Sequence, residues 1–529
     1  MRIPGKAVLA FLATFATLIL LHLPLLRLPY FWDEAGYYIP AALDFYRGWL
    51  LIPKTTLPVG HPPLVMIYLS LAWRIFGYSA WATRAAMTLI ATATVTGLYV
   101  LARRIASREI ATWSALLLAL SPLFFAQTTL AHLDLAAALF TMLAVLFLLG
   151  DQLWLFALAA SLAVLSKETA VVLLPVVWLG AWRRSRAGWR SLPPTWVPLV
   201  APFLLLAAWA LYYHHATGYW TGNRGYLSYN LYSTLSPGRL FWSLWRRAYE
   251  LFVGGFNWLL TAGALVGIWW GRKDETQNSK FETRNSKEVA IFGLRFSSFP
   301  SRVPSPESAA PPWRPFIFLT AGLVAIYLLL LSLVGGAILP RYLLPVLPLF
   351  YLAVVAMVTR LPRVPARLIL AAAAVCFVGA WFINPPYPFP LEDNLAYADF
   401  VWLHEQAAHY LEIQPGRPRI LTAWPATDEL ARPFLGYVRS SLRVVPVQGF
   451  APQDFVDVTP ESFDLLYLYS RRWEPPGNWV VRWPGWLRMQ GRYFDYQPQA
   501  AAPAVAARYH LRLVADMERR GQWVQIYSH

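Results

Sequence analysis

The sequence predicts an all-α membrane domain of about eleven transmembrane helices, with short juxtamembrane helices at its outer face, followed by a small α/β domain outside the membrane. Of the 529 residues, 57% are hydrophobic, and the mean hydropathy is +0.42. A soluble protein of this length does not carry so many apolar runs that are long enough to span a bilayer. The 26 Trp residues are typical of chains with many helix ends at the membrane interface. From about residue 384 the composition becomes that of a soluble domain.

Each predicted span is an apolar run with few charged residues. The first run lacks a small-residue cleavage site and continues into an aromatic segment, so we interpret it as a retained anchor and not as a signal peptide. The runs cover residues 7–28, 80–102, 110–127, 134–150, 152–166, 169–181, 195–216, 250–270, 315–334, 340–359 and 366–383.

The distribution of basic residues indicates the orientation of the chain. Lys and Arg number 45 against 28 acidic residues, and a formal net charge of +17 would also suit a nucleic-acid binder. Many of these residues, however, lie in short segments between apolar runs, and with eleven spans these segments share one side of the membrane, which is expected to be the cytoplasm. We therefore expect no nucleic-acid partner. The residues concerned are Arg2, Lys6, Arg103, Arg104, Arg108, Arg183, Arg184, Arg186, Arg190, Arg272, Lys273, Arg360, Arg363 and Arg367.

This orientation predicts a multi-pass protein of the cytoplasmic membrane with a cytoplasmic N-terminus. Segments 29–79 and 217–249 and the C-terminal region then lie on the outside. Cys376 is the single cysteine of the chain and falls within a predicted span. An intramolecular disulfide and a cysteine metal cluster are therefore both excluded.

Two domains are expected, a transmembrane domain at 1–383 and an extracytoplasmic domain at 384–529. Within the first, residues 271–314 are polar and rich in Ser and Pro, which predicts a flexible cytoplasmic loop. The second begins with a Pro-rich linker. Its patterns predict an amphipathic helix at 394–412, buried strands at 418–423 and 463–469, and a helix at 426–437.

Asp33 and Glu34 lie directly after the first span, between aromatic residues. Acids are scarce in a chain of which only 14% is charged. The simplest explanation is a solvated helix entrance. Aromatic neighbours, however, lower the local dielectric and can raise the pKa of a carboxyl group toward that of a useful general base.

Two further polar groups are expected at the same outer face. His61 precedes a rigid Pro-Pro turn and is suited to bind an anion or a metal, although a lone His is more often a polar surface residue. Asp134 begins the fourth span, where an Asp often serves only as a helix cap. Because Asp33 is predicted on the same face, the two carboxylates could share one site.

Lys167 and Glu168 interrupt two apolar runs, where charges are costly unless they are exposed or paired. Lys167 could neutralise a phosphate or could pair with Glu168 or an Asp. Arg341 begins the tenth span at the outer surface, where an arginine is unexpected. Together with the adjacent Tyr342 it suits a phosphate or carboxylate in the headgroup layer, unless it only reaches lipid phosphate. These groups predict a site for a lipid-linked anionic donor and a polar acceptor.

The order of these elements resembles the membrane glycosyltransferases of the GT-C superfamily. The nearest group is that of the protein O-mannosyltransferases and aminoarabinose-transferase-like enzymes, glycosyltransferase families 39 and 83. The resemblance covers roughly residues 7–360. It is carried by Asp33-Glu34, His61-Pro62-Pro63, Arg84 at the start of the second span, Asp134, Lys167 and Arg341-Tyr342.

The resemblance implies transfer of a sugar from a polyprenyl-phosphate carrier, usually with inversion. Asp33 would be the general base on the acceptor hydroxyl, and Glu34 and Asp134 would position acceptor or donor. The donor phosphate would be bound by Lys167, Arg341, Tyr342, His61 and Arg84. A lysine is expected at His61 in the aminoarabinose-transferase relatives, so a histidine there, partly charged at neutral pH, could make activity rise as pH falls. No cofactor is required, although some GT-C enzymes use a divalent cation, for which Asp33 and Asp134 would be the candidates.

We therefore expect a polyprenyl-phosphate-sugar-dependent glycosyltransferase at the outer face of the cytoplasmic membrane. Its acceptor would be a lipid, a glycan or a protein, and it would contact membrane lipid. Two alternatives stay open. One is a lipid or solute transporter, although transporters tend to place ionisable groups at mid-membrane and in repeated halves. The other is a membrane-anchored envelope assembly protein that acts through residues 384–529.

Overall fold

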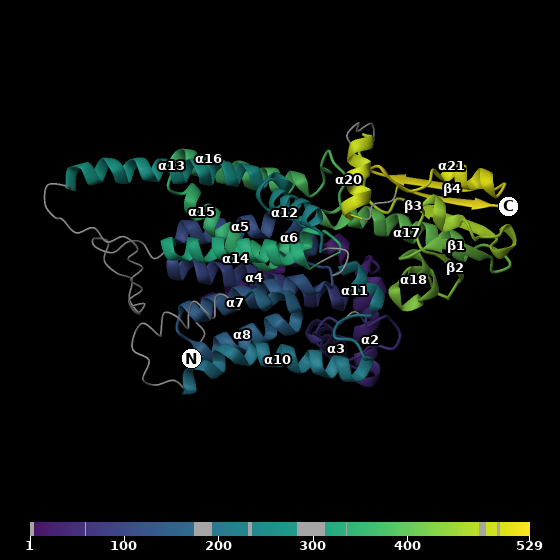
Figure 1. Cartoon of the computed structure of the whole chain (residues 1–529), viewed down its shortest axis with the longest axis horizontal. Helices are drawn as coiled ribbons and strands as arrows, with labels where there is room; N and C mark the ends of the chain where they lie inside the picture. Colours follow the sequence, from purple (N-terminus) through teal and green to yellow (C-terminus); the bar gives the residue numbers. More distant parts are fainter. Residues whose placement is uncertain are drawn as a thin grey trace.

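The computed structural model describes residues 5–58, 60–173, 193–230, 235–282, 313–334, 336–475, 483–494 and 498–529. Long helices lie side by side in a bundle, and a β-sheet domain sits beyond one end of it (Figure 1). The long helices are α1 (Gly5–Leu21), α4 (Ala80–Ile105), α5 (Arg108–Leu120), α7 (Leu133–Leu149), α8 (Leu153–Ser166), α10 (Pro193–Thr217), α13 (Asn257–Glu282), α14 (Trp313–Leu333), α15 (Leu347–Val358) and α16 (Arg363–Ala380).

Shorter elements connect these helices at the end of the bundle that faces the sheet (Figure 1). They shape the region where the candidate site residues lie. These elements are η2 (Glu34–Tyr38), α2 (Ile39–Gly48), α3 (Leu64–Phe76), α6 (Pro122–Gln127), η3 (Glu168–Leu173), α11 (Arg224–Asn230), α12 (Pro237–Phe252), η6 (Pro340–Val346) and η7 (Leu391–Asp393).

Several helices are long and apolar enough to cross a membrane. Among the described residues, five segments pass this test, and a bent pair formed by α12 and α13 makes a sixth. Four shorter apolar helices add to them, α1, α3, α7 and α8. A multi-pass membrane protein with a mostly helical membrane domain is thus confirmed, whereas the number of eleven spans stays a prediction.

The expected span at 250–270 is wrong in its N-terminal part. α12 ends at Phe252, and α13 begins at Asn257 after a bend of 42°. Gly255 lies between them with a φ of 57°, a left-handed conformation that glycine adopts without steric cost. The Gly254-Gly255 pair therefore ends one helix and lets the next start in a new direction.

The polar segment that was expected to begin a loop at residue 271 first continues α13 as far as Glu282. Residues 272–275 have good to moderate helix propensity, which outweighs the change in polarity. The rest of that stretch, residues 283–312, lies outside the described residues, and so do Arg183, Arg184, Arg186 and Arg190 of the predicted basic loops.

The described basic loops gather at the end of the bundle away from the sheet (Figure 1). Arg367 at the start of α16 pairs with Glu109 at the start of α5, with Nε and Oε1 2.8 Å apart. Arg360 packs beside Gly271 of α13. This clustering agrees with the expected separation of a basic end from the C-terminal domain.

The C-terminal domain holds a five-stranded mixed sheet in the order β2-β1-β3-β5-β4. The predicted strands correspond to β1 (Arg419–Ala423) and β3 (Leu465–Tyr469), and the first predicted helix to α17 (Ala396–Glu412). The second helix, α18, ends at Ala431 and not at 437, because Pro433 cannot continue it. The sequence analysis did not predict three strands and two helices of this domain. They are β2 (Arg443–Val447), β4 (Arg512–Arg519), β5 (Gln522–Ser528), α20 (Pro484–Phe494) and α21 (Ala502–Arg508).

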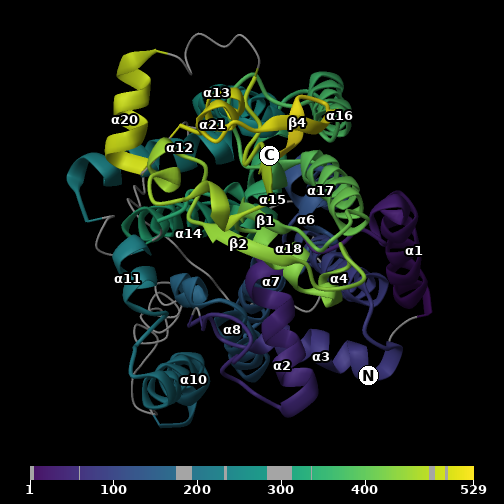
Figure 2. The same ribbon diagram turned by 90° about the vertical axis from the view of Figure 1, so that its right-hand side faces the viewer.

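Side chains connect this domain to the loops at the facing end of the bundle, and Figure 2 shows the sheet with α17 and α18 in front of that end. The Tyr437 hydroxyl donates to the carbonyl of Tyr30 at 3.1 Å. The Tyr78 hydroxyl donates to the carbonyl of Phe434 at 2.6 Å. The domain is therefore docked directly onto the segment that carries Asp33.

Candidate active site

A cavity of about 1350 Å³ lies between the C-terminal domain and the helix ends that face it. Much of its wall is apolar, with aromatic side chains of α12 and α20, while polar groups gather on η6 and η7. Five of the eight predicted site residues line it, namely Asp33, His61, Lys167, Arg341 and Tyr342. Glu34, Arg84 and Asp134 are not among the lining residues.

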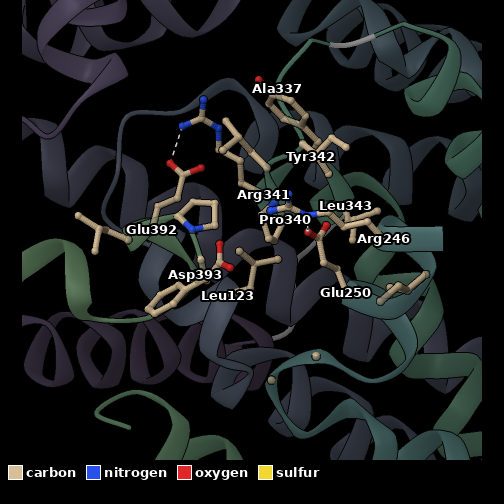
Figure 3. Close-up of a pocket in the computed structure, with 18 of the residues that line it drawn as sticks. Leu123, Arg246, Glu250, Ala337, Pro340, Arg341, Tyr342, Leu343, Glu392 and Asp393 are labelled. Carbon is tan, nitrogen blue, oxygen red and sulfur yellow. Dashed lines mark hydrogen bonds and ion pairs between the residues drawn. The ribbon is translucent and has the colours of Figure 1, made fainter. Parts of the chain in front are cut away.

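Arg341 is the centre of the polar cluster. One of its terminal nitrogens, Nη2, donates to Oδ2 of Asp33, and the other, Nη1, donates to Oε2 of Glu392 at 2.6 Å. Its Nε lies 3.7 Å from Oδ2 of Asp134. The guanidinium is 1% exposed, so water screens these interactions little. Figure 3 shows Glu392 turned toward this guanidinium. One arginine thus holds together three carboxylates from distant parts of the chain.

Asp134 is buried and pairs with two cations, Lys167 and Arg341. Its Oδ1 accepts a hydrogen bond from Nζ of Lys167 at 2.6 Å, and its side chain is 1% exposed. The ammonium of Lys167 also lies over the ring of Tyr342, 3.9 Å from the ring centroid. Asp134 therefore orients Lys167 and Arg341 from behind, while the two cations face the cavity.

Asp33 is the most exposed carboxylate of this cluster and lines the cavity. Its side chain is 19% exposed, against 1% for Asp134 and 4% for Glu392. Trp32, which precedes it, has a φ of 43°. Such a conformation costs about 1–3 kcal/mol in a non-glycine residue and persists only where the surroundings hold it. Here the Trp32 ring packs against Phe400 and Trp424 of the C-terminal domain, with centroids 5.5 and 5.4 Å apart.

Glu34 points away from Asp33 and pairs with Arg84 in the protein interior. Both side chains are at most 1% exposed. Glu34 also accepts hydrogen bonds from the backbone nitrogens of Phe31 at 2.8 Å and Ala131 at 2.5 Å. The structure thus does not bring Glu34 or Arg84 into the cavity. Instead, the pair of Glu34 and Arg84 holds in place the loops that carry Asp33 and Asp134.

His61 and Glu168 form a second pair at the cavity wall, with Nδ1 and Oε2 2.9 Å apart. His61 is mostly buried, with 13% of its side chain exposed. It reaches the same cavity as Lys167 and Arg341. The structure therefore brings together His61, Lys167 and Arg341, each already paired with a carboxylate, whereas Arg84 does not line the cavity.

The sequence reading missed an acidic group contributed by η7 and α12. Glu392 and Asp393 line the cavity beside Arg246 and Glu250, whose Nε and Oε1 are 3.0 Å apart (Figure 3). Burial, together with the nearby Asp33 and Asp134, raises the pKa of Glu392 to about 7 despite its contact with Arg341. Burial and the neighbouring Glu250 and Glu392 raise the pKa of Asp393 well above its usual range. His132 was also missed, and its Nε2 lies 3.1 Å from Nη1 of Arg341.

A signal for Glu392 and Asp393 was present in the sequence. They are adjacent acids that follow the last apolar span, in the same way as Asp33 and Glu34 follow the first. The intervening Pro-rich segment suggested only a linker. Arg246 lies in segment 237–252, where aromatic and basic residues at helical spacing form an amphipathic pattern that the sequence analysis did not use.

A divalent cation has no evident set of ligands here. The described residues contain no group of three or more His, Cys, Asp or Glu side chains arranged to hold a metal ion. Asp33 and Asp134, the two expected candidates, are both directed at Arg341. In this arrangement the guanidinium occupies the position that a cation would need.

Comparisons with known proteins point to one fold. Residues 60–216 match the family described as "Dolichyl-phosphate-mannose-protein mannosyltransferase". ArnT from Cupriavidus metallidurans in the apo state superposes with a TM-score of 0.55 at 14% identity, covering 99% of this chain and 98% of ArnT. ArnT bound to undecaprenyl phosphate gives the same TM-score and coverage at 15% identity. No sequence among curated proteins matches the chain.

Proposed function

We propose that this chain, which has the GT-C fold, is a membrane glycosyltransferase that moves a sugar from a polyprenyl-phosphate carrier to an acceptor hydroxyl. Asp33 is the general base. It removes the proton from the acceptor oxygen while that oxygen attacks the anomeric carbon of the sugar. The bond between that carbon and the phosphate oxygen breaks on the opposite face, so the sugar is inverted and polyprenyl phosphate leaves.

The observation that carries this proposal is the different exposure of the carboxylates. Of the three carboxylates to which the resemblance gave a role in the reaction, Asp33 alone lines the cavity, whereas Glu34 and Asp134 are buried in ion pairs. A general base must come within hydrogen-bond reach of the proton that it removes. The other two carboxylates support the site by holding its cations and its backbone.

The cations of the cavity suit the leaving group. Departure of the carrier places negative charge on a phosphate oxygen, and preorganised cations lower the barrier to such a step. Lys167, Arg341, His61 and Arg246 line one cavity, and Tyr342 contacts Lys167 there. Trp242 and Trp245 of α12 add apolar wall for the isoprenoid chain.

The family match and the ArnT fold support this class of reaction, because the one names a dolichyl-phosphate sugar donor and the other was solved with undecaprenyl phosphate. A transporter is disfavoured because the charged groups lie at the helix ends beside the C-terminal domain, whereas transport sites are usually near the membrane midplane. We place the reaction at the outer face of the cytoplasmic membrane, on the side of the C-terminal domain. The acceptor is a lipid, a glycan or a protein.

The proposed function is tested by mass spectrometry of lipid that co-purifies with the protein, followed by a transfer assay. We expect a polyprenyl phosphate carrying a sugar, and release of the free polyprenyl phosphate when the acceptor is present. Substrate uptake into proteoliposomes without any covalent product would contradict the proposal and favour transport.

A further inference from the structure

The cations that would receive the donor phosphate are occupied in the structure. Arg341 contacts Asp33, Asp134 and Glu392, and Lys167 contacts Asp134. Three carboxylates therefore share two cations, which leaves one excess negative charge when all are ionised. A phosphodiester brings another negative charge into the same buried region, where like charges repel strongly. Binding of the donor thus requires that one anion be displaced or neutralised.

Glu392 is the carboxylate best placed to give up its contact with Arg341. Asp134 is held from two sides by Lys167 and Arg341, and Asp33 must stay ionised to act as a base. Glu392 contacts Arg341 through Oε2 alone, and its Oε1, like Oδ2 of Asp134, is buried without a hydrogen-bond partner among the described residues. Because Glu392 also lines the cavity, an incoming phosphate oxygen can reach the Nη1 atom that it occupies.

We propose that Glu392 takes up a proton when the lipid-linked donor binds, and so releases Nη1 of Arg341 to the donor phosphate. The proton comes from water and is bound at the carboxyl group. It returns to water when polyprenyl phosphate leaves and Glu392 pairs with Arg341 again. The inference rests on the proposed function, because it requires that the cavity receive a phosphodiester.

The surroundings of Glu392 favour this exchange. The charged or titratable groups that face it are Arg341 and Tyr342 of η6, Asp33, His132, Asp134 of α7, Asp393 of its own turn, and Arg246 and Glu250 beside Asp393. From α6 it meets Gln127, which donates to its backbone carbonyl at 3.2 Å. On α17, Asp399 is paired with Arg519, and burial raises the pKa of Tyr397 to about 12.

These neighbours leave Glu392 easy to protonate. Burial and the two aspartates raise its pKa to about 7, so it is partly ionised at neutral pH in the empty site. Removal of its arginine partner by the phosphate withdraws the interaction that favours the charged form. The pKa in the donor complex is therefore higher still, and proton uptake follows by linkage.

The test uses the full-length protein in detergent and calorimetric titration with the methyl phosphodiester of farnesol. This probe has no second phosphate ionisation near neutral pH. Titrations in buffers of different ionisation enthalpy give the number of protons bound with the ligand. A group with a free pKa of about 7 predicts uptake of about 0.9 proton at pH 8 and about 0.5 at pH 7. The dissociation constant should rise about fivefold between these pH values.

Glu392→Gln is the decisive variant because it keeps the shape of the side chain and cannot titrate. It should bind the probe with uptake near zero at pH 8 and with less than a twofold change in dissociation constant. Asp44→Asn, at an acid that does not line the cavity, is the control and should retain the wild-type proton count. Thermal unfolding of each variant reports whether it is folded.

The outcomes separate the two proposals. Binding of the probe by the wild-type protein without proton uptake at pH 8 overturns the role of Glu392 and leaves the proposed function standing. Equal uptake in wild type and Glu392→Gln does the same. If the wild-type protein does not bind the phosphodiester at any pH, the proposed function is overturned, and the role of Glu392 with it.

Discussion

Asp33 and Glu34 are adjacent in the sequence and have opposite surroundings in the structure. Asp33 faces the cavity and Arg341, whereas Glu34 faces the interior and Arg84. The sequence could indicate that acids at this position matter, because charges beside an apolar span are costly. It could not assign their roles, because these depend on the direction of each side chain and on partners about fifty and three hundred residues away.

Arg84→Met is expected to lower stability and not donor affinity. It would leave Glu34 as an unpaired buried charge, which typically costs about 3–5 kcal/mol. The melting temperature in detergent should fall clearly, and the double variant Glu34→Gln/Arg84→Met should recover part of the loss. An unchanged melting temperature together with a raised KM for the donor would instead support a direct role of Arg84 in phosphate binding.

The raised pKa of Glu392 predicts that the free energy of unfolding depends measurably on pH. Its pKa rises from the usual 4.5 to about 7 in the folded protein, so the folded state holds its proton more tightly than the unfolded state. Its contribution is therefore favourable below about pH 4.5 and is lost as pH rises through 7. The full shift corresponds to about 3 kcal/mol in the free energy of unfolding.

The comparison of wild type with Glu392→Gln isolates this effect. The melting temperature of the wild type relative to that of the variant should decrease from pH 5 to pH 8. A difference that stays constant over this range would show that Glu392 titrates normally. An increase would mean that its pKa is lowered by Arg341.

At the scale of elements, the turn η2 and the C-terminal domain together position the base. Gly36 of η2 lies against the indole of Trp424, which also packs on Trp32. A Cβ atom added at Gly36 would come within 2.7 Å of this ring, so either the turn or the domain must shift. The position of Asp33 thus depends on contacts from a separate part of the chain.

Gly36→Ala should therefore reduce turnover while it leaves the protein folded. A displacement of about 1 Å in a catalytic group can cost about a hundredfold in rate. Gly48→Ala is the matched control, because its added Cβ would lie 3.5 Å from Leu50, an ordinary contact. Initial rates of polyprenyl phosphate release measure both variants. Equal rates would show that the contact with Trp424 does not position Asp33.

Elements that depend on local pattern could be predicted, and those that depend on tertiary contacts could not. The apolar runs gave most long helices within a few residues, and buried runs gave β1 and β3. Strand β4 was missed because all its side chains are exposed or partly buried, which weakens the hydrophobic signal. Strand β5 mostly alternates between buried and partly buried side chains, a pattern that the sequence analysis did not use. The break before α13 follows from Gly255, whose left-handed conformation no periodicity indicates.

At the scale of the whole molecule, the fold that the resemblance implied is confirmed by the likeness to ArnT over 99% of the chain. The residues that carried it are not all alike in role. Five line one cavity, and three support it from inside the protein. The C-terminal domain, for which the sequence suggested no part in the site, contributes Trp424 and Glu392 to the cavity wall.

The orientation of the molecule gives a further prediction. In a Cys376→Ala background, Ser440→Cys in the C-terminal domain should react with a membrane-impermeant maleimide in intact cells. Ser107→Cys, between α4 and α5 at the opposite end, should react only after the cells are opened. Both positions are exposed. The reverse pattern of labelling would place the cavity on the cytoplasmic side and exclude the proposed topology.

The most direct test of the central claim is the turnover of Asp33→Asn. The rate of polyprenyl phosphate release from the bound donor should fall by about a hundredfold or more, since a general base contributes about that much. Lipid-linked donor should still co-purify, because the cations are intact. Asp44→Asn, an acid in the same outer segment that does not line the cavity, should keep the wild-type rate. A wild-type rate in folded Asp33→Asn would contradict the assignment of Asp33 as the base.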